Sequence, residues 1–139
     1  MIVVDANILI RAVLGKKVRA LLRRYVGTCE FVAPVLVFRE ARENLPHILR
    51  RRSFALDTGL ASLDSICGLV SFIEPKTCGL LESRARKRLF LRDDDDWPIV
   101  ATALLVNYPI WIEDTDFFGC GVATWTSDRV EIYLAQSAA

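Results

Sequence analysis

Short apolar segments alternate with longer amphipathic segments along the whole chain. Apolar runs with the length of a buried strand predict strands at residues 2–5, 29–34, 70–75, 109–114 and 121–125. Apolar residues at helical spacing predict helices at residues 7–26, 34–44, 47–67, 77–90 and 93–107, and a short helix from Ser127 onward. Strands separated by helices indicate βαβ units, so the sequence predicts an α/β domain with a mainly parallel sheet of four to five strands, covered by helices on both faces.

Glycine, proline and aspartate mark where these helices should begin, end or divide. Gly15 can divide the first helix, and Gly59 can interrupt the helical region in the middle of the chain. Pro34 suits the first turn of the helix that it opens, where its missing N–H costs nothing. Pro46 is expected to end that same helix, because proline lacks the N–H that the helix interior needs. Asp96 is expected to cap the helix that follows it.

Composition narrows the class of protein. The chain has 139 residues, which is the length of a single domain, and 53% of them are hydrophobic while 25% are charged. These values exclude a disordered or low-complexity chain. No uncharged stretch reaches the roughly 20 apolar residues that a membrane span requires. Because the sequence opens MIVVD, without a basic region or a cleavage site, we expect no signal peptide and a cytoplasmic protein.

The cysteines and the single histidine exclude several kinds of site. Cys29, Cys67, Cys78 and Cys120 form no C-x-x-C pair, so we expect reduced, mostly buried thiols and neither a disulfide framework nor a cysteine zinc site. His47 is the only histidine, which excludes metal sites built from several histidines. It lies near no nucleophile motif, so a Ser–His–Asp triad is not favoured.

The charge is segregated along the chain even though its net value is +1. Residues 1–53 carry eleven Lys and Arg against four acids, whereas residues 93–128 carry eight acids and neither Lys nor Arg. A protein with one acidic pole and a basic remainder can hold cations at one place and phosphates around it.

Five carboxylates fall where a parallel sheet would bring them together. Asp5 ends the first predicted strand, Asp114 and Asp116 follow the fourth, Asp96 opens a helix, and Glu40 lies two turns into another. In open parallel sheets, sites form outside the carboxyl ends of the strands. A carboxylate cluster is electrostatically costly unless it is compensated, and Mg²⁺ or Mn²⁺ would compensate it because both ions prefer oxygen ligands.

Each acid also has a simpler interpretation. Asp5 could cap a helix or occupy a turn, and Glu40 could be a solvated helix residue with Glu43 as its rival. The run 93–96 could be an exposed loop that ends in a helix cap. Two acids directly after an apolar strand, Asp114 and Asp116, are harder to explain by packing alone. The occurrence of all five acids at one edge of the predicted sheet is stronger evidence for a site than any single acid.

The segments VVDANILI, FRE, DDDDWPIVATAL and WIEDTDFF, in this order and spacing, resemble a PIN-domain nuclease. The nearest type is the VapC-like toxin of bacterial and archaeal toxin–antitoxin pairs. The resemblance spans residues 2–125, and its most specific part is D-x-x-I-x-A-T-A from Asp96 followed by D-x-D-F from Asp114. It implies a PIN-like three-layer α/β/α fold over one domain, residues 1–139.

The resemblance also implies roles for individual residues. Asp5, Glu40, Asp96 and Asp114 match the catalytic, metal-binding acids of the family, Asp116 matches an auxiliary acid, and Asn7 matches a polar position beside the first acid. Two positions depart from the common pattern. Ala6 and Ile112 stand where similar proteins often have a hydroxyl residue that would support the metal ligands, which bears on metal affinity or rate.

The implied activity is hydrolysis of RNA phosphodiester bonds by water activated on one or two Mg²⁺ or Mn²⁺ ions. The resemblance implies products with 5′-phosphate and 3′-hydroxyl ends, a cognate antitoxin as a protein partner, and a homodimer. Arg84, Arg88 and Arg92 recur every four residues along one helix face that leads into the acidic run. Arginine suits phosphate, so these three are expected to contact RNA, with a plain solvated face as the alternative.

Other classes fit the residues less well. A haloacid-dehalogenase-type phosphatase needs a second acid where this chain has Asn7, and a response-regulator receiver needs a lysine after a late strand, whereas none follows Lys87. A ribonuclease-H-like nuclease opens with an antiparallel sheet, which the helices after each short strand argue against. The remaining alternative is a PIN-like module that binds RNA or a protein without cleaving.

Overall fold

Five short parallel strands form the centre of the computed structural model, which describes residues 1–90, 92–113, 115 and 117–138. The strands are β1 (Ile2–Val4), β2 (Phe31–Pro34), β3 (Val70–Ile73), β4 (Ile110–Ile112) and β5 (Thr124–Thr126). The helices are α1 (Ala6–Leu14), α2 (Lys16–Tyr25), α3 (Val35–Arg51), α4 (Leu56–Cys67), α5 (Pro75–Gly79), α6 (Glu82–Arg88), α7 (Trp97–Val106) and α8 (Val130–Ser137), with a 3₁₀ turn η1 (Asp94–Asp96) before α7.

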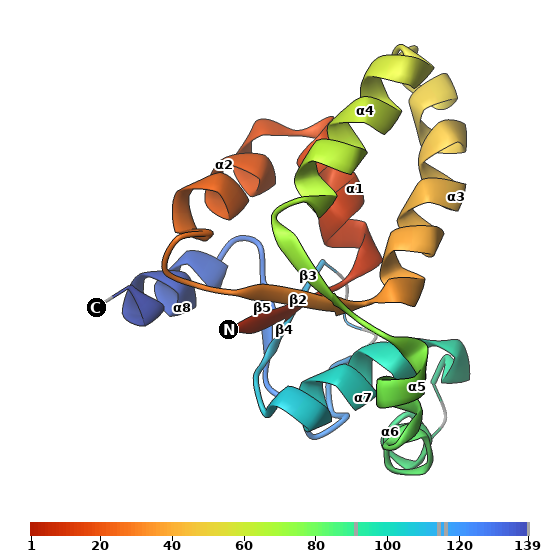
Figure 1. Ribbon diagram of the computed structural model, residues 1–139, viewed down its shortest axis with the longest axis vertical. Coiled ribbons are helices and arrows are strands. Elements are labelled where there is room, and N and C mark those ends of the chain that lie inside the picture. Colours follow the sequence, from red (N-terminus) through yellow and green to blue (C-terminus); the bar gives the residue numbers. More distant parts are fainter. Residues whose placement is uncertain (91, 114, 116, 139) are drawn as a thin grey trace.

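Helices cover both faces of this sheet. In Figure 1, α1 to α4 gather on one face and α5 to α7 on the other, while α8 lies near α2 and packs against it and β5. The predicted three-layer α/β/α architecture is therefore confirmed. The all-parallel pairing agrees with the rule that parallel sheets are buried on both faces.

The strand order β3-β2-β1-β4-β5 determines where a site can form. The chain moves outward from β1 to β2 and β3, and then returns to place β4 on the other side of β1. Crossovers on the two sides of β1 therefore run in opposite directions, which makes the carboxyl ends of β1 and β4 the topological switch point of the sheet. Ligands of open α/β sheets bind outside the strand ends at such a point.

The centre of the sheet is completely buried. Ile2, Val3 and Val4 of β1 and all three residues of β4 have no exposed surface. The indole of Trp111 in β4 lies 6.2 Å from the ring of Phe31 in β2 and donates a hydrogen bond of 2.9 Å from Nε1 to Ser127 Oγ. This satisfied and packed centre provides a rigid base for the residues that follow β1 and β4.

The prediction that Pro46 ends a helix was wrong, because α3 continues through it to Arg51. One face of α3 is buried both before and after the proline. Its buried residues recur every four positions, at Val37, Ala41, Leu45 and Leu49. Packing of this stripe against α1 and α4 outweighs the lost backbone hydrogen bond. The helix instead ends near Ser53, whose φ of 55° is left-handed.

The expected interruption at Gly59 was also wrong, since α4 runs unbroken across it. A Cβ atom at this position would lie 2.4 Å from Leu49 Cδ1. The absence of a side chain at Gly59 therefore leaves room for Leu49 where α3 and α4 pack together, and Gly59 does not break the helix. The division at Gly15 is confirmed, because α1 ends just before it and α2 begins just after it.

Residues 77–90, predicted as one helix, form two short helices. Residues 80–81 separate α5 from α6, and Leu81 has φ and ψ of −113° and 11°, outside the helical region. The predicted strands 70–75 and 109–114 are shorter than expected, since β3 and β4 stop at Ile73 and Ile112. No helix in the part of the chain that the structure describes has the length and apolarity needed to cross a bilayer.

The four cysteines are free thiols, as the sequence predicts. Cys29, Cys78 and Cys120 are buried, and Cys67 is half-buried. Burial, with a smaller contribution from the negative charge of Asp64, raises the pKa of Cys67 to about 11. The Cys67 thiol therefore stays protonated at neutral pH, which suits a packing residue more than a nucleophile.

Candidate active site

Asp5 is the best-defined carboxylate of the predicted site. It directly follows β1, it is only 6% exposed, and its backbone N–H donates to Trp111 O of β4 at 3.3 Å. Its side chain caps α1 by accepting a hydrogen bond of 2.6 Å from the backbone N–H of Ala6 at Oδ1. The positive end of the helix dipole favours the ionised carboxylate at this position. The capping interpretation and the ligand interpretation are compatible, because a carboxylate has several lone pairs.

Asp96 lies on the same edge of the sheet. It occupies the N-cap position of α7, which packs on β1 and β2. Trp97, the first residue of α7, lines a pocket together with Pro34, the last residue of β2. The N-terminus of α7 is therefore placed at the carboxyl end of β2, beside the end of β1. The helix that the sequence predicted to begin at this edge does so.

Glu40 approaches the same acidic run from α3. Its pKa is raised, first by burial and then by the negative charges of Asp93 and Glu43, although the residue retains exposed surface. Asp93, whose charge contributes to this shift, belongs to the segment that leads into Asp96. Neighbouring negative charges of this kind favour a cation.

The other predicted ligands, Asp114 and Asp116, lie outside the described residues. Within the described ranges, no group of three or more His, Cys, Asp or Glu side chains is close enough together to hold a metal ion. The acids that can be located, Asp5, Glu40 and Asp96, supply oxygen donors of the type that Mg²⁺ and Mn²⁺ bind. Asn7 lies on the exposed surface of the first turn of α1, next to Asp5.

The two positions that depart from the common pattern are both inside the core. Ala6 is 2% exposed and Ile112 has no exposed surface. Ala6 directly follows the predicted ligand Asp5, and Ile112 is two positions before the predicted ligand Asp114. Neither side chain can donate a hydrogen bond to a carboxylate, and Asp5 accepts one from the backbone N–H of Ala6.

A charged network that the sequence analysis missed fixes the end of β4. The carboxylate of Glu113 accepts hydrogen bonds from Arg11 of α1 and from Ser127 Oγ, and only 13% of its side chain is exposed. Ser127 Oγ in turn accepts from Trp111. This network orders the backbone immediately before Asp114. Its sequence signal is weak, since Arg11 and Glu113 are 102 positions apart.

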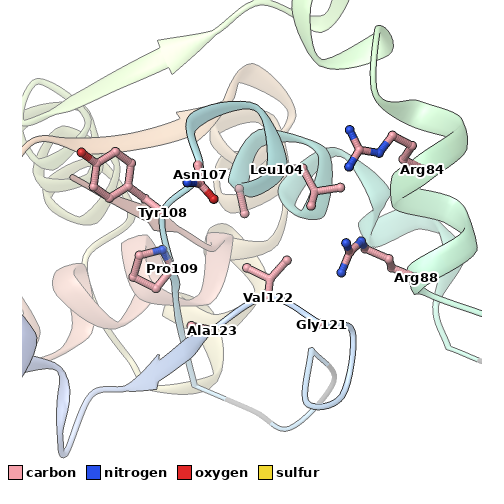
Figure 2. A pocket seen from close by; sticks show the side chains of 10 residues that line it. Arg84, Arg88, Leu104, Asn107, Tyr108, Pro109, Gly121, Val122 and Ala123 are labelled. Atoms are coloured by element: carbon pink, nitrogen blue, oxygen red, sulfur yellow. The ribbon is translucent and has the colours of Figure 1, made fainter.

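The three predicted RNA-binding arginines are located mainly beside the connection between β4 and β5. Figure 2 shows Arg84 and Arg88 projecting from α6 towards Leu104 and Val122. They line a surface pocket of about 380 Å³ whose other walls include Asn107 and Pro109, at the amino end of β4. This pocket is therefore at the amino ends of the strands, whereas Asp5 is at their carboxyl ends.

Arg88 and Arg92 hold the backbone of that connection. Arg88 Nη1 donates to Cys120 O at 3.2 Å, and Arg92 Nη1 donates to Thr115 O at 3.4 Å. The loop passes close to both guanidinium groups, because a Cβ at Gly121 would lie 2.2 Å from Arg88 Nη1. Gly119 and Gly121 have φ of 81° and 79°, which glycine adopts at little cost. Contact with RNA by these arginines stays a prediction, alongside this role in holding the loop.

The fold is shared with known structures. One is described as the crystal structure of VapBC2 from Rickettsia felis bound to a DNA fragment from their promoter, with a TM-score of 0.69 and 15% identity over 91% of this chain and 98% of that one. Another is a toxin–antitoxin complex from Klebsiella pneumoniae, with a TM-score of 0.62, 18% identity and the same coverage. No curated protein sequence matches the chain significantly.

A sequence model of one family covers almost the whole chain. The PIN domain model matches residues 3–135, which include the strand end at Asp5, the acidic segment before α7 and the end of β4. The resemblance predicted from the four motifs is therefore confirmed at the level of the family. This chain belongs to the PIN domain family.

Proposed function

We propose that this chain is a metal-dependent endoribonuclease that hydrolyses phosphodiester bonds in RNA. The observation that carries the proposal is the nearly buried carboxylate of Asp5 at the switch point of the sheet, in a chain of the PIN domain family. The first turn of α1 orients this carboxylate at the edge of the sheet where open α/β folds bind their ligands. The position of Asp96 at the neighbouring strand end and the negative field at Glu40 support the same conclusion.

In this proposal, Asp5, Glu40, Asp96 and Asp114 hold one or two Mg²⁺ or Mn²⁺ ions, and Asp116 is an auxiliary ligand. A bound divalent ion would lower the pKa of a water molecule and neutralise charge that develops on the scissile phosphate. The chain itself supplies the orientation. The α1 N-terminus fixes the Asp5 carboxylate, the packing of α7 on β1 and β2 fixes Asp96, and the Arg11–Glu113 pair fixes the strand end before Asp114.

The partners of the chain are also part of the proposal. The two similar structures are described as toxin–antitoxin assemblies, which supports a VapC-like toxin that is silenced by a cognate antitoxin in the cytoplasm. A homodimer is expected on the family resemblance. The acidic pole and the basic remainder of the chain are compatible with single-stranded RNA that crosses the carboxyl edge of the sheet.

The test compares the wild-type protein with Asp96→Asn and with Asp57→Asn, an exposed aspartate in the first turn of α4 that serves as the matched control. Each protein is incubated with a mixed single-stranded RNA pool in Mg²⁺, in Mn²⁺ and in EDTA, and thermal unfolding is recorded under the same conditions. We expect cleavage and metal-induced stabilisation for the wild type and for Asp57→Asn. Both effects should be lost in EDTA and in Asp96→Asn.

The outcomes separate the proposal from its alternative. Metal-induced stabilisation without cleavage of any RNA would overturn the catalytic proposal and favour a module that binds RNA or protein without cutting. Cleavage that persists equally in EDTA and in Asp96→Asn would overturn the role of the metal and of the acidic edge.

A further inference from the structure

A small apolar pocket adjoins the acidic edge of the sheet and has no role in the proposed chemistry. Its volume is about 160 Å³, and its walls come from the end of β2 with the first turns of α3, from α5 and from the first turn of α7. The residues that matter for the argument are Leu36, Arg39, Cys78, Trp97 and Pro98. The pocket therefore lies where three helices begin around the carboxyl end of β2.

The pocket has apolar walls and one cationic group. Among the described residues that line the pocket, Arg39 alone is charged, and the others are proline, valine, leucine, cysteine and tryptophan. The Cys78 thiol is within 3.3 Å of Thr102 Oγ1, so its hydrogen-bonding capacity is directed into the core. Trp97 is half-buried, and Arg86 lies 5.4 Å above its ring centroid, paired with Glu82 and Asp94. These contacts restrain the aromatic ring of Trp97.

At two places, a residue that lines the pocket is the direct neighbour in the sequence of a predicted acidic ligand. Arg39 directly precedes Glu40 on α3, and Trp97 directly follows Asp96 at the start of α7. In the proposed function, a divalent ion held by these acids would bind the scissile phosphate, and the neighbouring groups of the substrate would then lie near this pocket. The pocket is also smaller than the roughly 300–1,000 Å³ of sites for drug-sized ligands, so it suits one flat ring system and not a whole nucleotide.

We propose that this pocket receives one unpaired nucleobase of the RNA, next to the phosphate that is cleaved, and thereby contributes to sequence preference. This inference rests on the proposed function and names a subsite of the same active site. Single-stranded RNA is recognised mainly by bases that are splayed out onto aromatic and arginine side chains. Trp97 and the apolar walls provide the packing surface, and Arg39 donates hydrogen bonds to acceptor atoms on the edge of the base.

Two pairs of variants test the subsite. Leu36 is 43% exposed on α3 at the pocket, and Leu105 is 39% exposed on α7 away from it, so Leu36→Trp fills the pocket and Leu105→Trp is the matched control. Arg39→Gln removes the cation of the pocket, and Arg23→Gln on α2 removes an exposed arginine elsewhere. Both substitutions in the pocket are at surface positions, where they disturb folding least.

The probe is a set of short single-stranded RNAs in which each position in turn lacks its base. Binding is measured in EDTA by fluorescence anisotropy, and cleavage sites are mapped separately in Mg²⁺. We expect the wild type to lose affinity when one particular base is missing, by at least about fivefold, the value of one stacked base. Leu36→Trp should bind all members of the set equally, and Arg39→Gln should change the ranking of the four bases at that position. Leu105→Trp and Arg23→Gln should keep the wild-type pattern.

The binding measurement tests the base subsite, and the cleavage measurement tests the nuclease, so that either proposal can be overturned without the other. An unchanged dependence on the missing base in Leu36→Trp overturns the subsite, even where cleavage is intact. Absence of cleavage with the base-dependent binding intact overturns the nuclease and leaves the subsite supported. If Leu36→Trp instead alters self-association in sedimentation while its RNA binding stays as in the wild type, the pocket belongs to an interface between copies of the chain and the inference is overturned.

Discussion

The guanidinium of Arg11 on α1 is paired with the carboxylate of Glu113, the residue that follows β4. This pair joins the helix that Asp5 caps to the strand end that precedes Asp114. The two partners are unequally buried, because 58% of the Arg11 side chain is exposed and only 13% of the Glu113 side chain is. Glu113 also accepts a hydrogen bond from Ser127, so the pair is part of a network that reaches Trp111 in the sheet.

Removing the buried partner of this pair should cost more than removing the exposed one. We expect Glu113→Ala to lower the free energy of unfolding by about 1–3 kcal/mol, because it leaves Ser127 without its acceptor. Arg11→Ala should cost less than about 1 kcal/mol, since Arg11 is largely solvated. Urea denaturation of both variants and of the double variant gives the coupling energy. Equal effects of the two single variants would contradict the unequal burial.

Gly59→Ala should destabilise the protein, because the new Cβ would lie 2.4 Å from Leu49 Cδ1 between α3 and α4. Overpacking at such a contact costs about 1–3 kcal/mol. Gly79→Ala is the control, since nothing lies within 4 Å of a Cβ there and its φ is not left-handed. That control should be neutral or stabilising by up to about 1 kcal/mol. Thermal unfolding measures both, and partial rescue of Gly59→Ala by Leu49→Ala identifies the contact.

The sequence predicts the layers of the fold and the edge of the sheet that carries the acids. Asp5 and Asp96 could be placed because each adjoins a strand or helix whose apolar pattern is clear, and parallel strands align their carboxyl ends. Pro46 could not be interpreted locally, since the burial of Leu45 and Leu49 against α1 and α4 decides its conformation. The division of residues 77–90 into α5 and α6 is likewise not visible in the helical spacing of their apolar residues.

Contacts that depend on the order of the strands were not predictable. The Arg11–Glu113 pair requires β4 to lie beside β1, which the sequence pattern does not specify. Arg88 donates to the backbone carbonyl of Cys120. Because every residue has a backbone carbonyl, the sequence does not indicate which one accepts this hydrogen bond. The regular spacing of Arg84, Arg88 and Arg92 therefore suggested a phosphate-binding face, whereas the structure also assigns two of the three to the loop after β4.

Arg84 and Arg88 should differ in what they do, although both line the same pocket (Figure 2). Arg88→Gln removes the hydrogen bond to Cys120 O, so we expect it to lower thermal stability and to reduce cleavage together. Arg84→Gln should leave stability unchanged, and if Arg84 contacts a phosphate it should weaken RNA binding and reduce the salt dependence of binding by about one ion.

The measurements are thermal unfolding and RNA affinity over a series of salt concentrations. Gly121→Ala provides a second perturbation of the same contact, because its Cβ would lie 2.2 Å from Arg88 Nη1 at a residue with φ of 79°. It should reproduce the loss of stability of Arg88→Gln. A large loss of RNA affinity in Arg88→Gln with unchanged stability would instead favour direct contact with RNA over support of the loop.

The raised pKa of Glu40 gives the metal-free protein a defined dependence on pH. Burial and the charges of Asp93 and Glu43 make the folded-state pKa of Glu40 higher than its value in the unfolded chain. Protonated Glu40 therefore favours the folded state below the unfolded pKa, and this stabilisation is lost as pH rises through the folded pKa. At neutral pH in EDTA, the ionised Glu40 is a source of repulsion, so Glu40→Gln should raise the melting temperature. At acidic pH, where Glu40 is already protonated, the same variant should have little effect.

A divalent ion should reverse the sign of this effect at neutral pH. Mg²⁺ compensates the negative charges around Glu40, so the wild type should gain more stability from added Mg²⁺ than Glu40→Gln does. Glu30→Gln, an exposed glutamate just before the amino end of β2, is the control and should follow the wild type under all conditions. Melting curves of the three proteins at acidic and neutral pH, in EDTA and in Mg²⁺, provide the comparison. An identical response of Glu40→Gln and the wild type to Mg²⁺ would show that Glu40 does not take part in holding the ion.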